Sequence, residues 1–99
     1  MATSPTLGSQ VRVNNDVLFQ ELQGEAVLLN LKTGFYFGLN QTGTRVWRLL
    51  EQHSELAHVL AAMLTEYEVP EERCAQDLIG LVAELEKQGL VTVDSIGHR

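Results

Sequence analysis

The spacing of hydrophobic positions changes once along this chain, near residue 40. Before that point, short apolar runs cover residues 17–22, 26–31 and 35–39, each of strand length and bounded by Gly24 or by the segment Lys32-Thr33-Gly34. Gly34 can supply the positive φ that a short hairpin loop needs. Because the connections are short, the three runs predict an antiparallel meander.

The third run also predicts which side chains share a face. Side chains alternate along a strand, so one face carries Phe35, Phe37 and Leu39, and the other carries Tyr36 and Gly38. The first set is interpreted mainly as core.

After residue 40 the pattern becomes helical. Asn40 is a good N-cap for a first helix that ends near Gln52-His53, and Trp47 is its predicted core anchor. Ser54 is predicted to cap a second helix. Its apolar residues recur on one face, at Leu56, Val59, Leu60, Met63, Leu64 and Tyr67.

A third helix is predicted from Pro70 to about Gln88, because Pro70 and the acidic pair that follows it favour a helix start and Gly89 favours a stop. Its buried stripe is predicted to be Cys74, Leu78, Leu81, Val82 and Leu85. Residues 90–93 then predict a short final strand or wing.

The predicted order is β-β-β-α-α-α-β in one α+β domain, because the strands segregate from the helices. The domain is predicted to span residues 11–93. Residues 1–10, rich in Ser, Thr, Gly and Pro, are predicted to be a disordered N-terminal tail, and residues 94–99 a polar C-terminal tail.

Composition narrows the functional classes. The 99 residues fit one domain, and a hydrophobic content of 44% is too high for a disordered chain. One cysteine makes no intrachain disulfide, which fits a reducing compartment. The first residues lack the features of a signal peptide, and no apolar run approaches the ~20 residues of a membrane span, so we expect a cytoplasmic protein without a membrane partner.

Candidate catalytic chemistry is sparse. His53, His58 and His98 lack metal-ligand spacing, and Cys74 falls on a buried stripe where thiols are usually inert. The glycines form no phosphate-binding loop. We therefore expect no enzyme activity, no metal and no cofactor.

A winged-helix DNA-binding regulator is the alternative to a peptide-binding module, because the second and third helices followed by a strand fit that topology. A DNA reader should carry basic residues on the third helix. This helix instead carries five acidic and two basic residues, and the whole chain has a net charge of −6, so nucleic acid is not the expected partner. A structural subunit of a larger enzyme is a third class.

The stretch from Phe37 to Leu50, FGLNQTGTRVWRLL, resembles the strand-to-helix signature of the PqqD-like family. An aromatic-Gly-Leu-Asn is followed there by a Gly and by a Trp one turn into the helix. Residues 25–31 with Thr33-Gly34 resemble the second strand and hairpin of that family, and residues 69–72 and 77–90 resemble its final helix. The resemblance covers about residues 11–93.

This resemblance implies a three-stranded antiparallel meander packed on a three-helix winged helix-turn-helix bundle. It also implies a non-catalytic chaperone that recognises the leader segment of a ribosomally made precursor peptide. Relatives deliver that peptide to a radical S-adenosylmethionine (SAM) enzyme, a cyclodehydratase or a leader peptidase, in the biosynthesis of natural products or of the cofactor pyrroloquinoline quinone (PQQ).

A peptide would bind by strand addition to the edge strand 35–39, in a groove against the third helix. Apolar walls and a polar rim are expected from residues on the second strand, the third strand and the third helix. They are Leu29, Tyr36, Phe37, Gly38, Arg73, Gln76, Asp77, Leu78 and Leu81. An unoccupied edge also predicts self-pairing into a homodimer.

Overall fold

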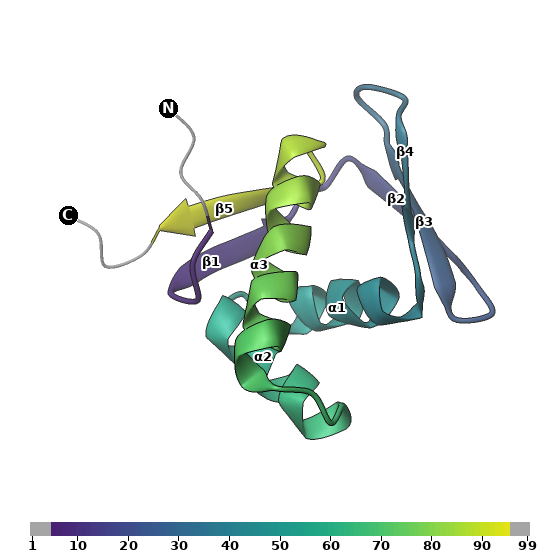
Figure 1. The fold of residues 1–99 in the computed structure, drawn as a ribbon. Coiled ribbons are helices and arrows are strands. Elements are labelled where there is room, and N and C mark those ends of the chain that lie inside the picture. The colour runs from purple at the N-terminus through teal and green to yellow at the C-terminus, as the bar shows by residue number, and fades with distance from the viewer. Residues whose placement is uncertain (1–4, 96–99) are drawn as a thin grey trace.

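The computed structural model describes residues 5–95 and forms an α+β fold with antiparallel sheets and three helices (Figure 1). The elements follow in the order β1 (Ser9–Val13), β2 (Val17–Leu22), β3 (Glu25–Asn30), β4 (Tyr36–Leu39), α1 (Gln41–Gln52), α2 (Leu56–Glu66), α3 (Glu71–Lys87) and β5 (Val91–Ser95).

The predicted meander is confirmed. β2, β3 and β4 pair antiparallel in that order, with Leu28 opposite Phe37 and Ala26 opposite Leu39. Gly34 has a φ of 80°, as its place in the turn requires. The buried side chains of Ala26, Leu28 and Leu39 turn one face of this sheet toward the core.

The prediction for Phe35 is wrong. Its side chain is 67% exposed, and β4 begins one residue later, at Tyr36. The backbone N–H of Phe35 donates to Thr33 Oγ1 at 3.2 Å, so this residue still belongs to the turn. Its side chain therefore lies beyond the part of β4 that packs on the core.

A strand that was not predicted pairs the two ends of the domain. β1 begins at Ser9, inside the segment predicted as a tail, and pairs antiparallel with β5 from Ser9–Ser95 to Val13–Val91. β5 extends to Ser95, past the predicted boundary at residue 93; residues 1–4 and 96–99 lie outside the described residues. The observed order is therefore β-β-β-β-α-α-α-β, and the last strand joins β1 in a separate two-stranded sheet.

The helix ends follow the predicted signals with one exception. Asn40 caps α1, because its Oδ1 accepts the N–H of Gly43 at 2.8 Å, and Gly89 stops α3 with a φ of 75°. Ser54 does not cap α2; the N-cap is Glu55, and no side chain bonds there. The carbonyl of Ser54 instead accepts the N–H of Val11 at 2.7 Å, which joins the α1–α2 connection to β1.

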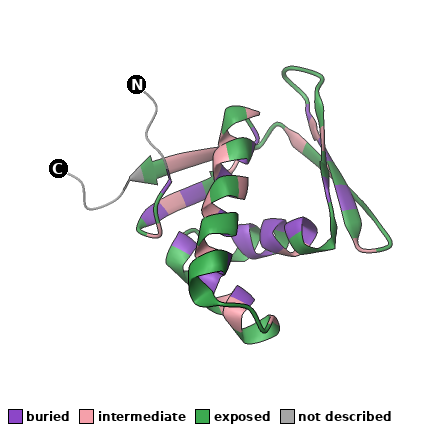
Figure 2. Cartoon of the chain, in the orientation of Figure 1, coloured by how far each residue is buried: buried purple, intermediate pink, exposed green. Residues whose placement is uncertain are grey.

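The core lies where the helices meet the two sheets (Figure 2). Its largest fully buried side chain is Trp47 of α1, 1% exposed, as predicted. Four of the five residues predicted for the buried stripe of α3 are buried, but Leu81 is only half-buried. Leu81 packs against the core from its edge and stays partly exposed.

Candidate functional site

The free edge of β4 is the first part of the site. Among the described strands, β4 pairs with β3 only and therefore ends the three-stranded sheet. The backbone N–H of Asn30 donates to the carbonyl of Phe35 at 2.9 Å, so these two residues form a hydrogen-bonded pair between β3 and the start of β4. Since hydrogen-bonded and non-hydrogen-bonded pairs alternate in an antiparallel ladder, Phe37 bonds to β3 while the backbone groups of Tyr36 and Gly38 point outward.

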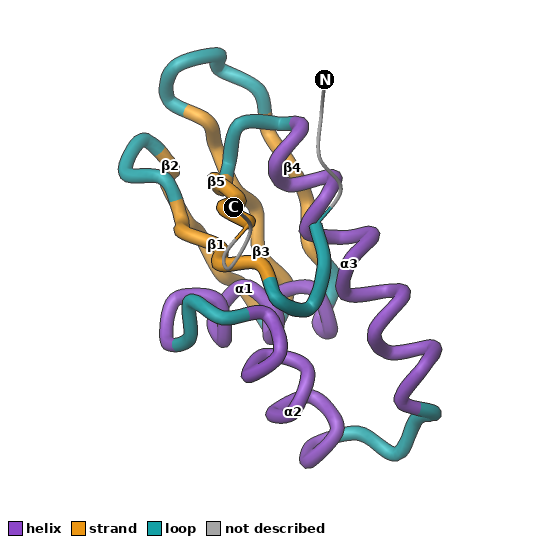
Figure 3. Tube along the Cα trace, turned by 90° about the vertical axis from the view of Figure 1, so that its left-hand side faces the viewer, coloured by secondary structure: helices purple, strands orange, loops and turns teal. Residues whose placement is uncertain are grey.

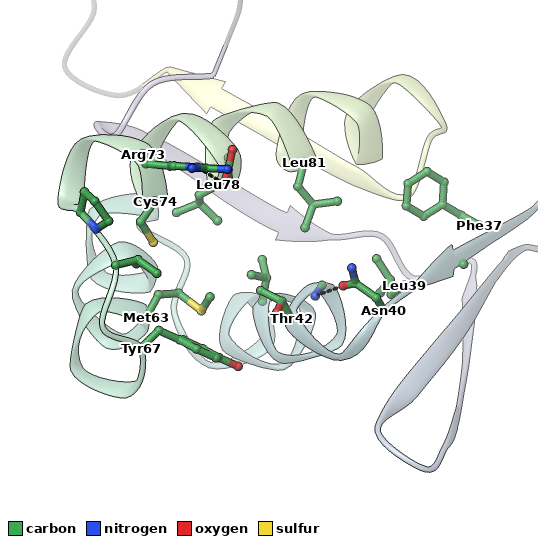
Figure 4. A pocket seen from close by; sticks show the side chains of 16 residues that line it. Phe37, Leu39, Asn40, Thr42, Met63, Tyr67, Arg73, Cys74, Leu78 and Leu81 are labelled. Carbon is green, nitrogen blue, oxygen red and sulfur yellow. Dashed lines mark hydrogen bonds and ion pairs between the residues drawn. The ribbon is translucent and has the colours of Figure 1, made fainter.

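A groove of about 640 Å³ lies between this edge and α3. In two perpendicular views α3 runs past β4, and α1 lies below the space between them (Figures 1 and 3). Phe37 and Leu81 stand at one end of the groove, and Met63, Tyr67 and Cys74 stand at the other (Figure 4). The groove therefore continues from the strand edge into a wider apolar end between the helices.

The interior of the groove is apolar. Leu39, Val46, Met63 and Leu78 are buried core residues that also face it. Burial raises the pKa of the Cys74 thiol, and the nearby Asp77 carboxylate raises it further, so Cys74 stays protonated near neutral pH. The groove thus offers apolar contacts and no activated nucleophile.

The rim of the groove carries charge. Arg73 and Asp77 lie one turn apart on α3, with Arg73 Nε 4.0 Å from Asp77 Oδ2, and both side chains are largely exposed. An exposed pair of this kind contributes little to stability. Both groups therefore remain available to a ligand that lies along α3.

The structure brings six of the nine predicted site residues into the groove. These are Phe37, Gly38, Arg73, Asp77, Leu78 and Leu81. It does not bring in Leu29, Tyr36 or Gln76. Leu29 lies opposite Tyr36 in the sheet register, and these two side chains stand on the face turned away from α1; Gln76 is exposed on α3 outside the groove.

Other groove residues were not predicted as part of a site. They are Leu39, Asn40, Thr42, Gly43, Val46, Met63, Tyr67, Val69, Pro70 and Cys74. Most of them are explained in the sequence as core or capping residues, so nothing there marks them as part of a site. Tyr67 is the exception. It continues the apolar stripe of α2 beyond the end of that helix at Glu66, which could have indicated a role outside the core.

Within residues 5–95, no group of His, Cys, Asp and Glu side chains is placed to hold a metal ion. None of the helices described there is long and apolar enough to cross a membrane.

A small α+β domain with a free strand edge beside an apolar groove defines a binding module. A family model described as coenzyme PQQ synthesis protein D (PqqD) matches residues 25–91, about two thirds of the chain. The chain belongs to this PqqD family, as its strand-to-helix signature predicted.

Two solved structures resemble the whole fold. One is TbiB1 in complex with the TbiA(beta) leader peptide, with 31% identity, a TM-score of 0.77, and coverage of 89% of this chain and 98% of that chain. The other is a lasso peptide synthetase B1 complexed with the leader peptide, with 25% identity, a TM-score of 0.75, and coverage of 84% and 98%. The comparison with curated protein sequences finds no match.

Proposed function

We propose that this protein binds the leader segment of a ribosomally synthesised precursor peptide as an additional strand on β4. The observation that carries the proposal is the apolar groove between the outward backbone groups of Tyr36 and Gly38 and the α3 wall. Both structural neighbours contain a leader peptide, which supports the same class of ligand here. In this proposal the protein holds the peptide extended and leaves the chemistry to a partner enzyme.

Backbone pairing alone is too weak for this function. Tyr36 and Gly38 each offer one N–H and one C=O, and net hydrogen bonds contribute about 0.5–1.5 kcal/mol each, a few kcal/mol together. Micromolar binding requires about −8 kcal/mol. The apolar interior of the groove must therefore supply the rest, through leader side chains that fill it.

The bound peptide would then be delivered to a modifying enzyme. The candidate classes are a radical SAM enzyme, a cyclodehydratase or a leader peptidase, acting in natural-product or cofactor biosynthesis. We interpret α2, α3 and the two-stranded β1–β5 sheet as a winged helix-turn-helix. In this arrangement it supports a peptide groove. A DNA contact is disfavoured by the acidic character of α3.

The direct test is a proton–nitrogen NMR titration with the leader peptide encoded beside this gene. We expect shifts concentrated in β4 and along the groove side of α3, with saturation near micromolar concentration. Shifts confined to other elements, or none at hundreds of micromolar, would contradict the proposal. Duplex DNA serves as the control ligand and should cause no shifts.

Gly38→Val should weaken leader binding by about tenfold or more while changing the free energy of unfolding by less than about 1 kcal/mol. A Cβ at Gly38 would meet nothing within 4 Å, so the free protein accommodates the side chain, which then occupies space beside the strand edge. Calorimetric titration and urea unfolding measure the two effects.

Gly80→Ala is the matched control, because Gly80 also has open space around its Cβ position and lies on α3 outside the groove. It should raise the stability by about 0.5–1 kcal/mol and leave the affinity unchanged. Equal losses of affinity in both variants, or a Gly38→Val loss explained by unfolding, would remove Gly38 from the site.

The free edge of β4 should also pair with itself at high concentration. An unpaired edge strand is a template for another strand, and here the second strand would come from a second copy of the chain. We expect the weight-average mass in sedimentation to rise at millimolar concentration and to return to that of the 1:1 complex when equimolar leader is added. A concentration-independent monomer mass would contradict self-pairing.

A further inference from the structure

The two walls of the groove belong to different parts of the fold. β4 is held by β3 and packs over α1, whereas α3 packs on α2 and continues into β5. The described hydrogen bonds include none between β4 and α3. Besides the apolar core that both walls share, contacts at the ends of these elements therefore set the position of one wall relative to the other.

Asn30 makes such a contact. It ends β3 and is only 5% exposed. Its Nδ2 donates to the carbonyl of Gln88 at 2.9 Å, and to that of Gly89 at 3.4 Å, at the C-terminus of α3. A single side chain thus links the sheet to the end of the opposite groove wall.

The other half of the same amide organises the hairpin that leads into β4. Asn30 Oδ1 accepts the N–H groups of Lys32 and Thr33 at 2.9 and 3.2 Å. Its backbone carbonyl accepts the N–H of Gly34 at 2.7 Å. The turn that positions β4 and the end of α3 are therefore both bonded to one buried residue.

The approach between these parts is close. A Cβ added at Gly89 would lie 2.9 Å from Asn30 Nδ2, nearer than side-chain carbons pack. Gly89 thus serves both as the left-handed stop of α3 and as the space into which the Asn30 amide fits. The length of the Asn30 side chain then fixes the separation of the two elements at this end.

We propose that Asn30 is a positioning residue that sets the width of the groove between β4 and α3, and thereby its selectivity for an extended peptide strand. This inference rests on the proposed function. Asn30 does not line the groove, so it would act on a bound peptide only through the position of the walls.

Asn30→Asp separates the bond from Asn30 to the end of α3 from the bonds that Asn30 makes in the hairpin turn. Aspartate has the same shape and keeps an oxygen for the N–H groups of Lys32 and Thr33. It loses the N–H donor and turns a carboxylate oxygen toward the Gln88 and Gly89 carbonyls, which repel it. Asn30→Ser is a second, uncharged variant, whose hydroxyl is too short to reach Gln88.

Asn14→Asp is the matched control. Asn14 Nδ2 also donates to the Gly89 carbonyl, at 2.8 Å, and its Oδ1 accepts the Thr92 hydroxyl. The substitution adds the same charge and removes a bond to the same end of α3. It acts from the connection after β1 and leaves the link to the hairpin intact.

Leader affinity and the unfolding midpoint should be measured for all three variants. We expect Asn30→Asp and Asn30→Ser to bind about tenfold more weakly, counted per folded molecule, because a loosened groove must be ordered on binding. Asn14→Asp should stay within about twofold even if it is equally destabilised. Wild-type affinity in both Asn30 variants, or equal losses in all three, would overturn the proposal.

A second readout does not need the leader. Spin labels at Lys32→Cys and Glu84→Cys, in a Cys74→Ala background, report the distance between the hairpin and α3. We expect Asn30→Asp to broaden or shift this distance distribution and Asn14→Asp to leave it narrow; an unchanged distribution in Asn30→Asp would overturn the positioning role. If the unsubstituted protein binds no leader, the proposed function fails, and this distance alone decides whether Asn30 sets the groove.

Discussion

Replacing Leu81 with aspartate is expected to weaken leader binding by about a hundredfold while the domain stays folded. Leu81 is half-buried and stands on the α3 wall of the groove, on the same side of it as Phe37. Burying a leucine-sized contact is worth about 1.5–3 kcal/mol, and a carboxylate in the apolar groove adds a desolvation cost. Since each 1.4 kcal/mol changes the affinity tenfold, a loss of two orders of magnitude follows.

Ala83→Asp provides the control for this prediction. Ala83 is also half-buried on α3 but does not line the groove. Ala83→Asp therefore adds the same charge to α3 as Leu81→Asp and also lowers the helix propensity. Calorimetric titration should show wild-type affinity for Ala83→Asp, and urea unfolding should show both variants folded at the working temperature. Tight binding by Leu81→Asp would mean that the peptide does not use this wall.

The parts of the fold that sequence predicts well are those fixed by neighbouring residues. Gly34 and Gly89 need a positive φ where they stand, and Asn40 caps the N–H of Gly43 three residues later. Each signal acts within a few residues, so it can be recognised without a structure. β1 could not be recognised in this way, because Val11 pairs with Val93 at the far end of the chain.

The site is harder to predict because it depends on how two faces meet. Leu81 follows the apolar spacing of α3. Sequence alone cannot show that its side chain is only half-buried, at the edge of the core. The period of the strand separates Tyr36 from Phe37 but does not say which face turns toward α3. Tyr36 is predicted from the sequence to line the groove, but its side chain is 72% exposed and lies on the other face, because Phe37 and Leu39 turn inward.

Trp47→Ala is the substitution expected to cost the most stability. Trp47 is 1% exposed in the core, and truncating a buried aromatic to alanine costs about 3–5 kcal/mol. Small domains have about 5–15 kcal/mol in total, so this variant loses a large share of its stability. Urea unfolding should show a much lower midpoint than for the unsubstituted protein.

Trp47→Phe is the milder comparison. No protein atom among the described residues accepts a hydrogen bond from Trp47 Nε1, so phenylalanine gives up volume but no bond to the protein. Its cost should therefore be well below that of alanine. A phenylalanine variant as unstable as the alanine variant would show that the indole N–H matters to the fold.

Trp47→Ala and Leu81→Asp together separate a core residue from a contact residue. Trp47 does not line the groove, so the folded fraction of Trp47→Ala should bind leader with unchanged intrinsic affinity. Leader at a hundred times its dissociation constant should then restore about 2.7 kcal/mol, because a ligand that binds only the folded state stabilises it by mass action. Restoration of that size in Trp47→Ala, and little in Leu81→Asp at the same leader concentration, would assign Trp47 to the scaffold and Leu81 to the site.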